Sequence, residues 1–291
     1  MSESHVREPS GRFAELPRAL QATVRVERLA ANRTPYKDGG IPALLAHPDD
    51  GWLEPGATPR PAPTVLWMHG RTVRKEIDPG RYLRWKKLGI ATCAIDMPAH
   101  GERANNQQNT SVYSLPMAEQ AAHEVDLVVD ALADPHFKGA FDLNRLAIGG
   151  MSLGGMATLI RLCNIVGGGH NFRCAILEAT TGDLDSVGAR AKYSDEMVER
   201  LSPINHLDMW TLPIPILAVH SKLDEWVPIA GQRRFFEALR TRYAELSADP
   251  GMLQLHEWPS TGAEAEHMGF GRRTNDTKNM ENEFLQRWLF A

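Results

Sequence analysis

Apolar runs and amphipathic segments alternate along most of this chain. Apolar runs predict buried strands at 64–68, 90–95, 145–149, 174–177 and 214–220, and a further strand is predicted at 252–258. The segments between them repeat apolar residues at helical spacing and predict helices at 82–88, 117–132, 152–165, 229–246 and 279–290. Buried strands that alternate with helices are typical of an α/β protein, whose mostly parallel sheet is covered by helices on both faces.

The N-terminal part of the chain has a different rhythm. The segment 22–27 alternates polar and apolar residues, as a half-buried strand does, and 41–46 predicts a second strand with Pro42 near its start. We interpret the two strands as an antiparallel edge of the sheet. A loop is predicted for the Gly-, Pro- and Asp-rich segment 49–63, and an irregular or helical lead-in for the first twenty or so residues.

Composition favours one domain over residues 1–291, since 43% of the 291 residues are hydrophobic and no internal repeat is present. The net charge is −4 with both signs spread along the chain, which argues against a nucleic-acid partner. No apolar run has the length of a signal peptide core or a membrane span. Three cysteines in core-like segments indicate free thiols. We therefore expect a cytoplasmic protein with a small-molecule substrate, and the oligomeric state stays open.

The segment Gly150-Met151-Ser152-Leu153-Gly154 follows a predicted buried strand and precedes a predicted helix. This pattern is typical of a nucleophile elbow, a tight turn that holds a serine in a strained conformation clear of the sheet. Side chains two residues before and after that serine would clash, and Gly150 and Gly154 have none. The turn also aims the Leu153 N–H toward the position where an oxyanion would form. A glycine-rich turn with an incidental serine is the alternative.

A serine nucleophile needs a histidine base and a carboxylate to orient that histidine, and after an elbow they follow in the order serine, acid, histidine. Asp224 lies in a loop between a predicted strand and a helix, at the sheet edge where such sites form. Glu225, Asp183 and Asp185 are the rival acids. His267 is the predicted base, because it follows the last predicted strand; His256 lies inside that strand.

In these motifs and their order, the chain resembles the α/β-hydrolase superfamily from about Val24 to its C-terminus. The resemblance rests on Met68-His69-Gly70-Arg71, Asp96-Met97-Pro98-Ala99-His100-Gly101, the elbow, and the loops of Asp224 and His267. Its closest likeness is to bacterial esterases and peptidase-like hydrolases of the dienelactone hydrolase and prolyl oligopeptidase group. The resemblance implies an α/β-hydrolase fold and a backbone N–H of Arg71 as the second oxyanion donor, beside Leu153.

Several polar residues near these motifs have two readings. His69 and His100 are expected to support their loops rather than to transfer protons, because one base suffices for acyl transfer. The Arg71, Arg74 and Lys75 cluster could attract an anionic acyl group, but a solvated loop is the preferred interpretation. Trp226 is a candidate for the wall of the substrate pocket, or a cover for the core. No metal-ligand spacing is visible, so neither a metal nor an organic cofactor is expected.

We expect a serine hydrolase that cleaves carboxylic esters through an acyl-enzyme. A peptidase, an acyltransferase or a carbon–carbon bond hydrolase would use the same residues, and a non-catalytic ligand-binding protein is a further alternative. Oligopeptidases of the resembled group carry an N-terminal β-propeller, for which some sixty residues before the first central strand give no room. The charged segment 182–209, expected to be helical at 183–201, is predicted to form a small cap, with Leu184, Val187, Ala191, Val198 and Leu201 facing inward.

Overall fold

A computed structural model describes residues 16–21, 23–31, 33, 39–105 and 110–291. Within this part the chain forms one eight-stranded sheet. The strands are β1 (Val24–Leu29), β2 (Ile41–Ala46), β3 (Ala62–Met68), β4 (Ala91–Ile95), β5 (Phe141–Met151), β6 (Cys174–Glu178), β7 (Ile216–Ser221) and β8 (Leu253–Trp258). The α-helices are α1 (Arg18–Gln21), α2 (Pro79–Lys87), α3 (Ser114–Leu132), α4 (Leu153–Leu162), α5 (Asp195–Leu201), α6 (Ile229–Glu245) and α7 (Thr274–Leu289).

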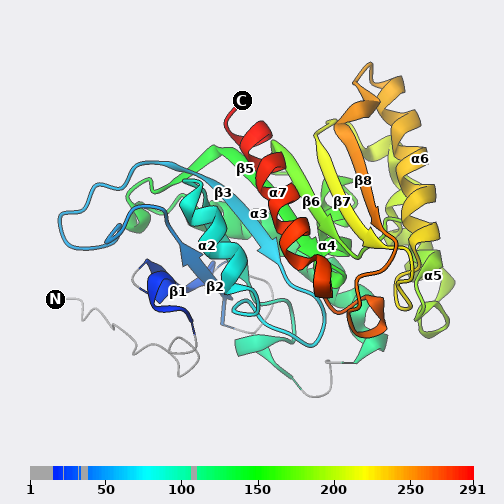
Figure 1. Ribbon diagram of the computed structural model, residues 1–291, viewed down its shortest axis with the longest axis horizontal. Coiled ribbons are helices and arrows are strands. Elements are labelled where there is room, and N and C mark those ends of the chain that lie inside the picture. The colour runs from blue at the N-terminus through cyan, green and yellow to red at the C-terminus, as the bar shows by residue number, and fades with distance from the viewer. Residues whose placement is uncertain (1–15, 22, 32, 34–38, 106–109) are drawn as a thin grey trace.

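The sheet has the order β1-β2-β4-β3-β5-β6-β7-β8. β1 pairs antiparallel with β2, and β2 antiparallel with β4, whereas the strands from β4 to β8 pair in parallel. The predicted parallel sheet with an antiparallel N-terminal edge is therefore confirmed. The parallel strands all end at the same edge of the sheet, so the loops after β3, β5, β7 and β8 gather there (Figure 1).

Helices cover both faces of the sheet (Figure 1). Tyr82 and Trp85 of α2 pack with Phe284 and Leu285 of α7 in one apolar core. Helices α3, α4 and α6 contribute to a second core on the opposite face. Because two apolar layers enclose the central strands, every residue of β3, β4 and β6 is buried, which explains their unbroken apolar runs.

The sequence placed most elements correctly but not all of their ends. β5 begins at Phe141 and α7 at Thr274, earlier than expected, because the extended pairing of β5 with β3 and the packing of α7 are decided between distant segments. The expected lead-in before residue 16, and residue 22 of the first strand, lie outside the described residues. β2 is buried along its whole length, since β1 and β4 flank it.

The segment 182–209 differs from the expected helix over 183–201. Only α5 is α-helical; 3-10 turns at Leu184–Ser186, Arg190–Lys192 and Pro203–Met209 make up much of the remainder. Asp183 accepts a hydrogen bond from the Asp185 N–H, and such a side-chain contact favours a turn over a continued helix. Of the residues expected to face inward, Ala191 is exposed, while the other four are buried.

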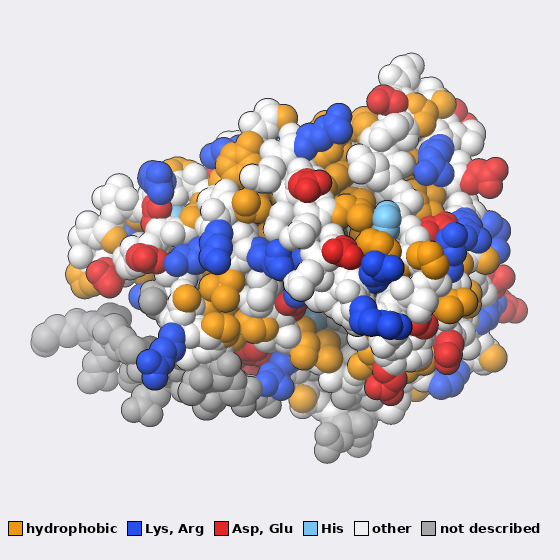
Figure 2. Space-filling model, viewed as in Figure 1, with side chains coloured by type: hydrophobic (Ala, Val, Ile, Leu, Met, Phe, Trp, Pro, Cys, Tyr) orange, Lys and Arg blue, Asp and Glu red, His pale blue; other side chains and the backbone are white. Residues whose placement is uncertain are grey.

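No helix in the described residues is long and apolar enough to cross a bilayer. On the face shown in Figure 2, basic and acidic side chains are interspersed rather than gathered into a field of one sign.

Candidate active site

The loop after β5 has the geometry of the predicted elbow. Ser152 has φ 51° and ψ −113°, a strained conformation for a residue with a side chain. A Cβ atom added to Gly154 would lie 2.1 Å from the Met68 carbonyl oxygen, and one added to Gly150 would lie 2.5 Å from the carbonyl carbon of Gly154. The two glycines are therefore required by close packing, as the sequence predicted.

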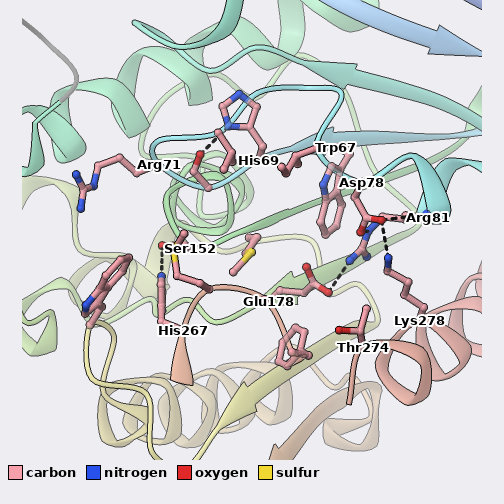
Figure 3. Close-up of a pocket in the computed structure, with 18 residues that line it drawn as sticks. Trp67, His69, Arg71, Asp78, Arg81, Ser152, Glu178, His267, Thr274 and Lys278 are labelled. Carbon is pink, nitrogen blue, oxygen red and sulfur yellow. Dashed lines mark hydrogen bonds and ion pairs between the residues drawn. The ribbon is translucent and has the colours of Figure 1, made fainter. Parts of the chain in front are cut away.

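Ser152, His267 and Asp224 form one continuous chain of hydrogen bonds. His267 Nε2 lies 2.8 Å from Ser152 Oγ, and His267 Nδ1 lies 2.8 Å from Asp224 Oδ2. The histidine and the aspartate are buried. Figure 3 shows Ser152 and His267 facing each other at the side of a cavity. The three residues come from the ends of β5, β7 and β8, and this arrangement is the one that activates a serine for acyl transfer.

Asp224 is held as a carboxylate by its neighbours. Burial tends to raise the pKa of its carboxyl, but hydrogen bonds from His220 and His267 outweigh burial and leave the pKa below its ordinary value. The second oxygen, Oδ1, accepts from the Trp226 and Val227 N–H groups. A carboxylate fixed at both oxygens can orient His267 and stabilise its positive charge during turnover.

None of the rival acids contacts His267 through its carboxylate. Glu225 is exposed, and its N–H donates to the Ala265 carbonyl oxygen. Asp183 pairs with Arg234, and Asp185 pairs with Arg190. His256 stays in β8, where its ring contacts Trp258 with centroids 4.2 Å apart.

The loop that carries His267 is held by Glu266, which the sequence analysis did not single out. The Glu266 carboxylate accepts hydrogen bonds from Ser221 Oγ at 2.7 Å, Ser260 Oγ at 2.8 Å, the Thr261 N–H at 2.6 Å and the Gly262 N–H at 2.8 Å. Burial works to raise the pKa of Glu266, but these bonds outweigh it and lower the pKa well below its ordinary value. Ser221 belongs to the strand before Asp224, so Glu266 ties the histidine loop to the acid loop.

The hydrogen bonds of Glu266 also hold an unfavourable backbone conformation in this loop. Ala265 and Glu266 both have φ of 51°, the left-handed region that residues with side chains rarely adopt. We expect Glu266→Gln to lower kcat by roughly tenfold, with a smaller change in KM, because the amide cannot accept all of these bonds and His267 loses its fixed position. Steady-state kinetics on one ester tests this; a KM increase at unchanged kcat would contradict a positioning role. Glu264→Gln, two residues earlier in the same loop, is the matched control.

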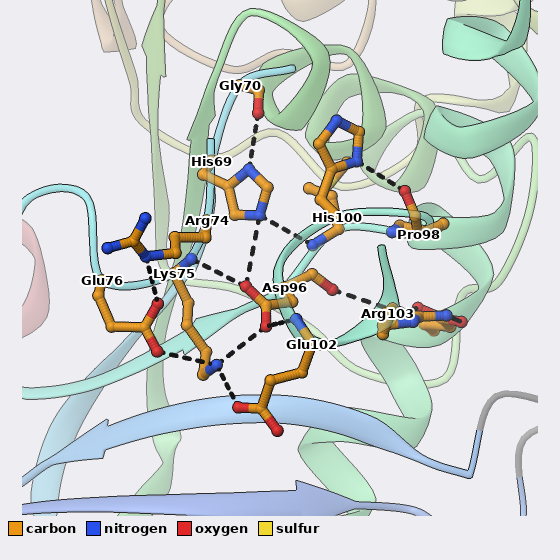
Figure 4. Close-up of polar contacts among 12 residues, drawn as sticks. His69, Gly70, Arg74, Lys75, Glu76, Asp96, Pro98, His100, Glu102 and Arg103 are labelled. Atoms are coloured by element: carbon orange, nitrogen blue, oxygen red, sulfur yellow. Dashed lines mark hydrogen bonds and ion pairs between the residues drawn. The ribbon is translucent and has the colours of Figure 1, made fainter. Parts of the chain in front are cut away.

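The His69-Gly70-Arg71 loop is anchored to the next strand. His69 Nδ1 donates to the Gly70 carbonyl oxygen at 2.6 Å, and Nε2 accepts from the Met97 N–H at 3.0 Å (Figure 4). Burial lowers the pKa of His69 to about 4, so the ring is neutral and its 3.8 Å approach to Asp96 is not an ion pair at neutral pH. These contacts fit the supporting role expected of His69.

His100 has a similar place. Its Nδ1 donates to the Pro98 carbonyl oxygen at 2.7 Å, and burial lowers its pKa. The ring packs edge-on against His69 with centroids 5.5 Å apart, away from the hydrogen bonds of Ser152. A role in the shape of the loop therefore fits this histidine better than proton transfer.

The expectation of a solvated Arg71, Arg74 and Lys75 cluster is wrong for Lys75. Its side chain is buried, and Nζ lies 2.9 Å from Asp96 Oδ2 and 2.6 Å from Glu102 Oε1 (Figure 4). Burial works to lower the pKa of Lys75, but the carboxylates of Asp96 and Glu102 raise it. The adjacent Glu76 lies 2.9 Å from the same Nζ atom, but Asp96 and Glu102 are more than twenty residues away in sequence, so local composition gave no sign of their pairing with Lys75.

The predicted oxyanion donors lie beside the nucleophile. Leu153 is the first residue of α4, so its N–H has no partner within the helix. A Cβ atom added to Gly70 would lie 3.6 Å from Ser152 Cβ, which places the loop of Gly70 and Arg71 against the elbow. Both backbone donors can thus approach a carbonyl oxygen bound at Ser152.

Two chambers meet at Ser152 and His267. The first, here called the apolar chamber, has a volume of about 370 Å³. Its apolar walls are Trp67, Val73, Ile77, Met151, Met268 and Phe270. The second, here called the polar chamber, has a volume of about 300 Å³. Its polar side chains are Arg71, Ser111, Ser114, Lys192, Tyr193 and Glu225.

Trp226 lies where the two chambers meet. Its indole is 40% exposed, lines both chambers, and has its ring centroid 5.0 Å from that of His267. This position fits the pocket wall more closely than a cover for the core, because the ring faces the site and solvent.

A buried charge network closes the far side of the apolar chamber. No local pattern in the sequence indicated it. Arg81 is paired with Asp78, Glu178 and Glu281, and it stacks on Trp67 at 4.2 Å from the ring centroid. Burial and the adjacent Glu178 raise the pKa of Glu281 well above its ordinary value, against the effect of Arg81. The Glu178 carbonyl oxygen accepts from the Ser152 N–H at 2.8 Å, which links the network to the elbow.

The described residues contain no group of three or more His, Cys, Asp or Glu side chains arranged to hold a metal ion. Cys93, Cys163 and Cys174 are buried free thiols, and burial raises the pKa of each. They are therefore unreactive packing residues, in line with the sequence.

The eight-stranded sheet, the elbow and the hydrogen-bonded serine, histidine and aspartate define a serine hydrolase of the α/β-hydrolase superfamily. Within it, the chain belongs to the prolyl oligopeptidase family, whose sequence profile matches residues 85–289.

Individual relatives include esterases and peptidases. The chain is 24% identical over 219 residues to the protein described as "Putative esterase YitV" of Bacillus subtilis, and the match covers 67% of this chain and 80% of that one. Its fold is similar to TT1662 from Thermus thermophilus, with a TM-score of 0.64, 21% identity and coverage of 92% of this chain and 99% of that chain.

A puromycin-hydrolyzing peptidase of Mycobacterium tuberculosis has a TM-score of 0.68 and 18% identity, but here 94% of this chain corresponds to 40% of the other. The Pyrococcus furiosus esterase Pf2001 has a TM-score of 0.61 and 19% identity, and the match covers 94% of this chain and 96% of that chain.

Proposed function

We propose that this protein hydrolyses carboxylic esters through an acyl-enzyme. The observation that carries the proposal is the continuous hydrogen-bonded chain from Asp224 through His267 to Ser152. In the proposed reaction Ser152 Oγ attacks the ester carbonyl carbon while His267 Nε2 takes the hydroxyl proton. The carbonyl oxygen becomes an oxyanion, which the N–H groups of Leu153 and Arg71 stabilise.

The intermediate then collapses. His267 returns the proton to the leaving alkoxide, the carbon–oxygen bond breaks, and the alcohol departs. Water attacks the acyl-enzyme by the same route, with His267 again as the base, and releases the carboxylic acid and free Ser152. Asp224 stays ionised throughout and stabilises the imidazolium that forms twice in each cycle.

An ester is the preferred substrate because the relative described as "Putative esterase YitV" matches 67% of this chain and 80% of its own length. A peptidase is the second candidate, since the family is that of prolyl oligopeptidase and the same three residues cleave amides. The two differ in the leaving group, because an amine must be protonated before it departs, whereas an alkoxide leaves more readily.

The test combines a fluorophosphonate probe with matched substrates. Labelling by the probe separates a catalyst from a non-catalytic binding protein. Phenyl hexanoate, the corresponding thioester and the corresponding anilide then rank the leaving groups by kcat/KM. The proposal expects the ester to exceed the anilide by at least roughly a hundredfold; an anilide or peptide cleaved faster than the ester would make the protein a peptidase.

We further propose that the 182–209 segment acts as a small cap that tunes substrate size. Val187, Ala189 and Tyr193 of this segment line the polar chamber beside Ser152. Leu184 and Leu201 are fully buried and join the core, so the segment is anchored to the domain while its other side faces the chamber.

Narrowing the polar chamber at Ala189 tests the cap. Ala189→Leu is expected to lower kcat/KM for hexanoyl esters relative to acetyl esters by roughly tenfold, because added methyl groups occupy the space of a longer acyl chain. Ala191→Leu, on the exposed side of the same segment, is the matched control. If both variants keep the chain-length profile of the parent, the segment only packs on the sheet.

A further inference from the structure

Four cationic side chains line the two chambers, and they differ in their partners. Arg81 and Lys278, in the apolar chamber, are both paired with Asp78. Lys192, in the polar chamber, and Arg71, which lines both chambers, have no carboxylate partner among the described residues. The contact recorded for the Lys192 ammonium is the hydroxyl of Ser111. Asp78 therefore neutralises the two cations that line the apolar chamber alone, whereas Arg71 and Lys192 bring positive charge without a carboxylate partner to the polar chamber.

The position of Arg71 separates it from the neighbouring basic residues. Lys75 is neutralised by buried carboxylates, and Arg74 lies 3.4 Å from Glu76. The Arg71 side chain instead leaves the loop on the side away from Arg81 and Lys278 (Figure 3). Its charge acts on the Tyr193 hydroxyl and on His100, so the guanidinium lies within electrostatic reach of the cap. Its backbone, meanwhile, adjoins Ser152.

Arg71 is half-buried as a residue, and a guanidinium that loses hydration without gaining a counterion is costly. Its planar fork of donors matches the two oxygens of a carboxylate. Lys192 and the hydroxyls of Ser111 and Ser114 line the same chamber and add further donors. Among the described residues, Glu225 is the one acid in the lining; it is exposed, and the two cations leave this part of the chamber with a surplus of positive charge.

We infer that the polar chamber is a carboxylate-binding subsite, and that the substrates are half-esters of dicarboxylic acids whose free carboxylate is bound by Arg71 and Lys192. The inference rests on the proposed ester hydrolysis and names its substrate class. The acyl half enters the polar chamber beneath the cap. The apolar chamber, with walls such as Trp67, Ile77 and Phe270, receives the apolar alcohol half.

Matched ester pairs test the inference. Monophenyl succinate, glutarate and adipate each carry a terminal carboxylate, and phenyl butanoate, pentanoate and hexanoate replace it by a methyl group. The inference expects at least one of the three anionic esters to exceed its neutral partner in kcat/KM by roughly tenfold or more, since a charge-assisted hydrogen bond contributes about that factor. High salt should reduce the ratio, because the pair is partly exposed.

A second pair of substrates carries the carboxylate on the alcohol half of the ester instead of the acyl half. The hexanoyl ester of 4-hydroxybenzoate is compared with that of 4-methylphenol. A preference confined to this arm would overturn the assignment of the acyl half to the polar chamber. Equal rates for anionic and neutral esters in both arms would overturn the carboxylate subsite itself.

Variants locate the subsite. Arg71→Gln and Lys192→Gln should each reduce the ratio of anionic to neutral kcat/KM by roughly three- to tenfold, and Arg71→Lys should keep part of it. The ratio is the readout, so a loss common to both substrates, for example through the Arg71 backbone, cancels. Arg200→Gln is the control, since Arg200 lies in the same segment but pairs with Glu119 outside both chambers. A preference that survives in both glutamine variants would contradict these residues as its source.

The same measurements distinguish a failure of ester hydrolysis from a failure of the carboxylate subsite. If no ester of either charge is cleaved while the fluorophosphonate still labels the protein, ester hydrolysis is wrong. If neutral esters are cleaved and anionic ones are not preferred, ester hydrolysis stands and the carboxylate subsite is wrong.

Discussion

Replacing Ser152 by alanine is expected to lower kcat/KM for ester substrates by roughly a millionfold, because the nucleophile and base act as one unit and neither works alone. The physical basis is the 2.8 Å contact between Ser152 Oγ and His267 Nε2, which alanine removes completely. Fluorophosphonate labelling gives an independent measurement. Intact-mass analysis should show one adduct on the parent protein, on Ser152, and none on the variant.

Two controls make this result interpretable. The melting temperature of Ser152→Ala should stay close to that of the parent, since the strained φ of 51° belongs to the backbone and the lost hydroxyl is small. Ser221→Ala removes a buried hydroxyl of the same size near the site, at the contact with Glu266, and should keep reactivity with the probe. An adduct that persists on folded Ser152→Ala would assign the nucleophile to another residue.

Asp224→Asn is expected to lower kcat by roughly ten-thousandfold while the fold is retained. The Asp224 carboxylate accepts a hydrogen bond from the His267 Nδ1–H, with 2.8 Å between the nitrogen and Oδ2. An amide in its place favours the wrong tautomer, with the proton on Nε2, and that nitrogen then cannot take the proton of Ser152. Steady-state kinetics on an activated ester, with circular dichroism to verify folding, measures the effect.

Glu225→Gln is the matched control for the acid. It removes a carboxylate from the adjacent position, but the Glu225 side chain is exposed and contacts neither His267 nor Ser152. The control should retain activity within a few-fold of the parent. The assignment of the acid is wrong if Glu225→Gln is inactive and Asp224→Asn is not.

Local patterns in the sequence determined the fold class and the nucleophile. Buried parallel strands need apolar residues on both faces, so runs such as 64–68 and 174–177 identified them without knowledge of their neighbours. The elbow was also visible locally, because its backbone strain requires glycines at 150 and 154 within one short turn. Asp224 and His267 followed from their order and from their positions after strands.

The tertiary structure decided which charged residues are paired and which remain free. Lys75 has the same local setting as Arg71, yet Asp96 and Glu102, both in the segment that follows β4, neutralise only Lys75. Glu266 holds the His267 loop through a hydrogen bond from Ser221, which lies on a strand some forty residues earlier. The ion pairs of Arg81 include Glu281 from α7. Burial and pairing of this kind depend on contacts between distant segments, and a one-dimensional pattern carries no record of those contacts. Sequence alone therefore determined the fold class and the nucleophile, whereas tertiary packing decided which of the surrounding charged side chains are paired.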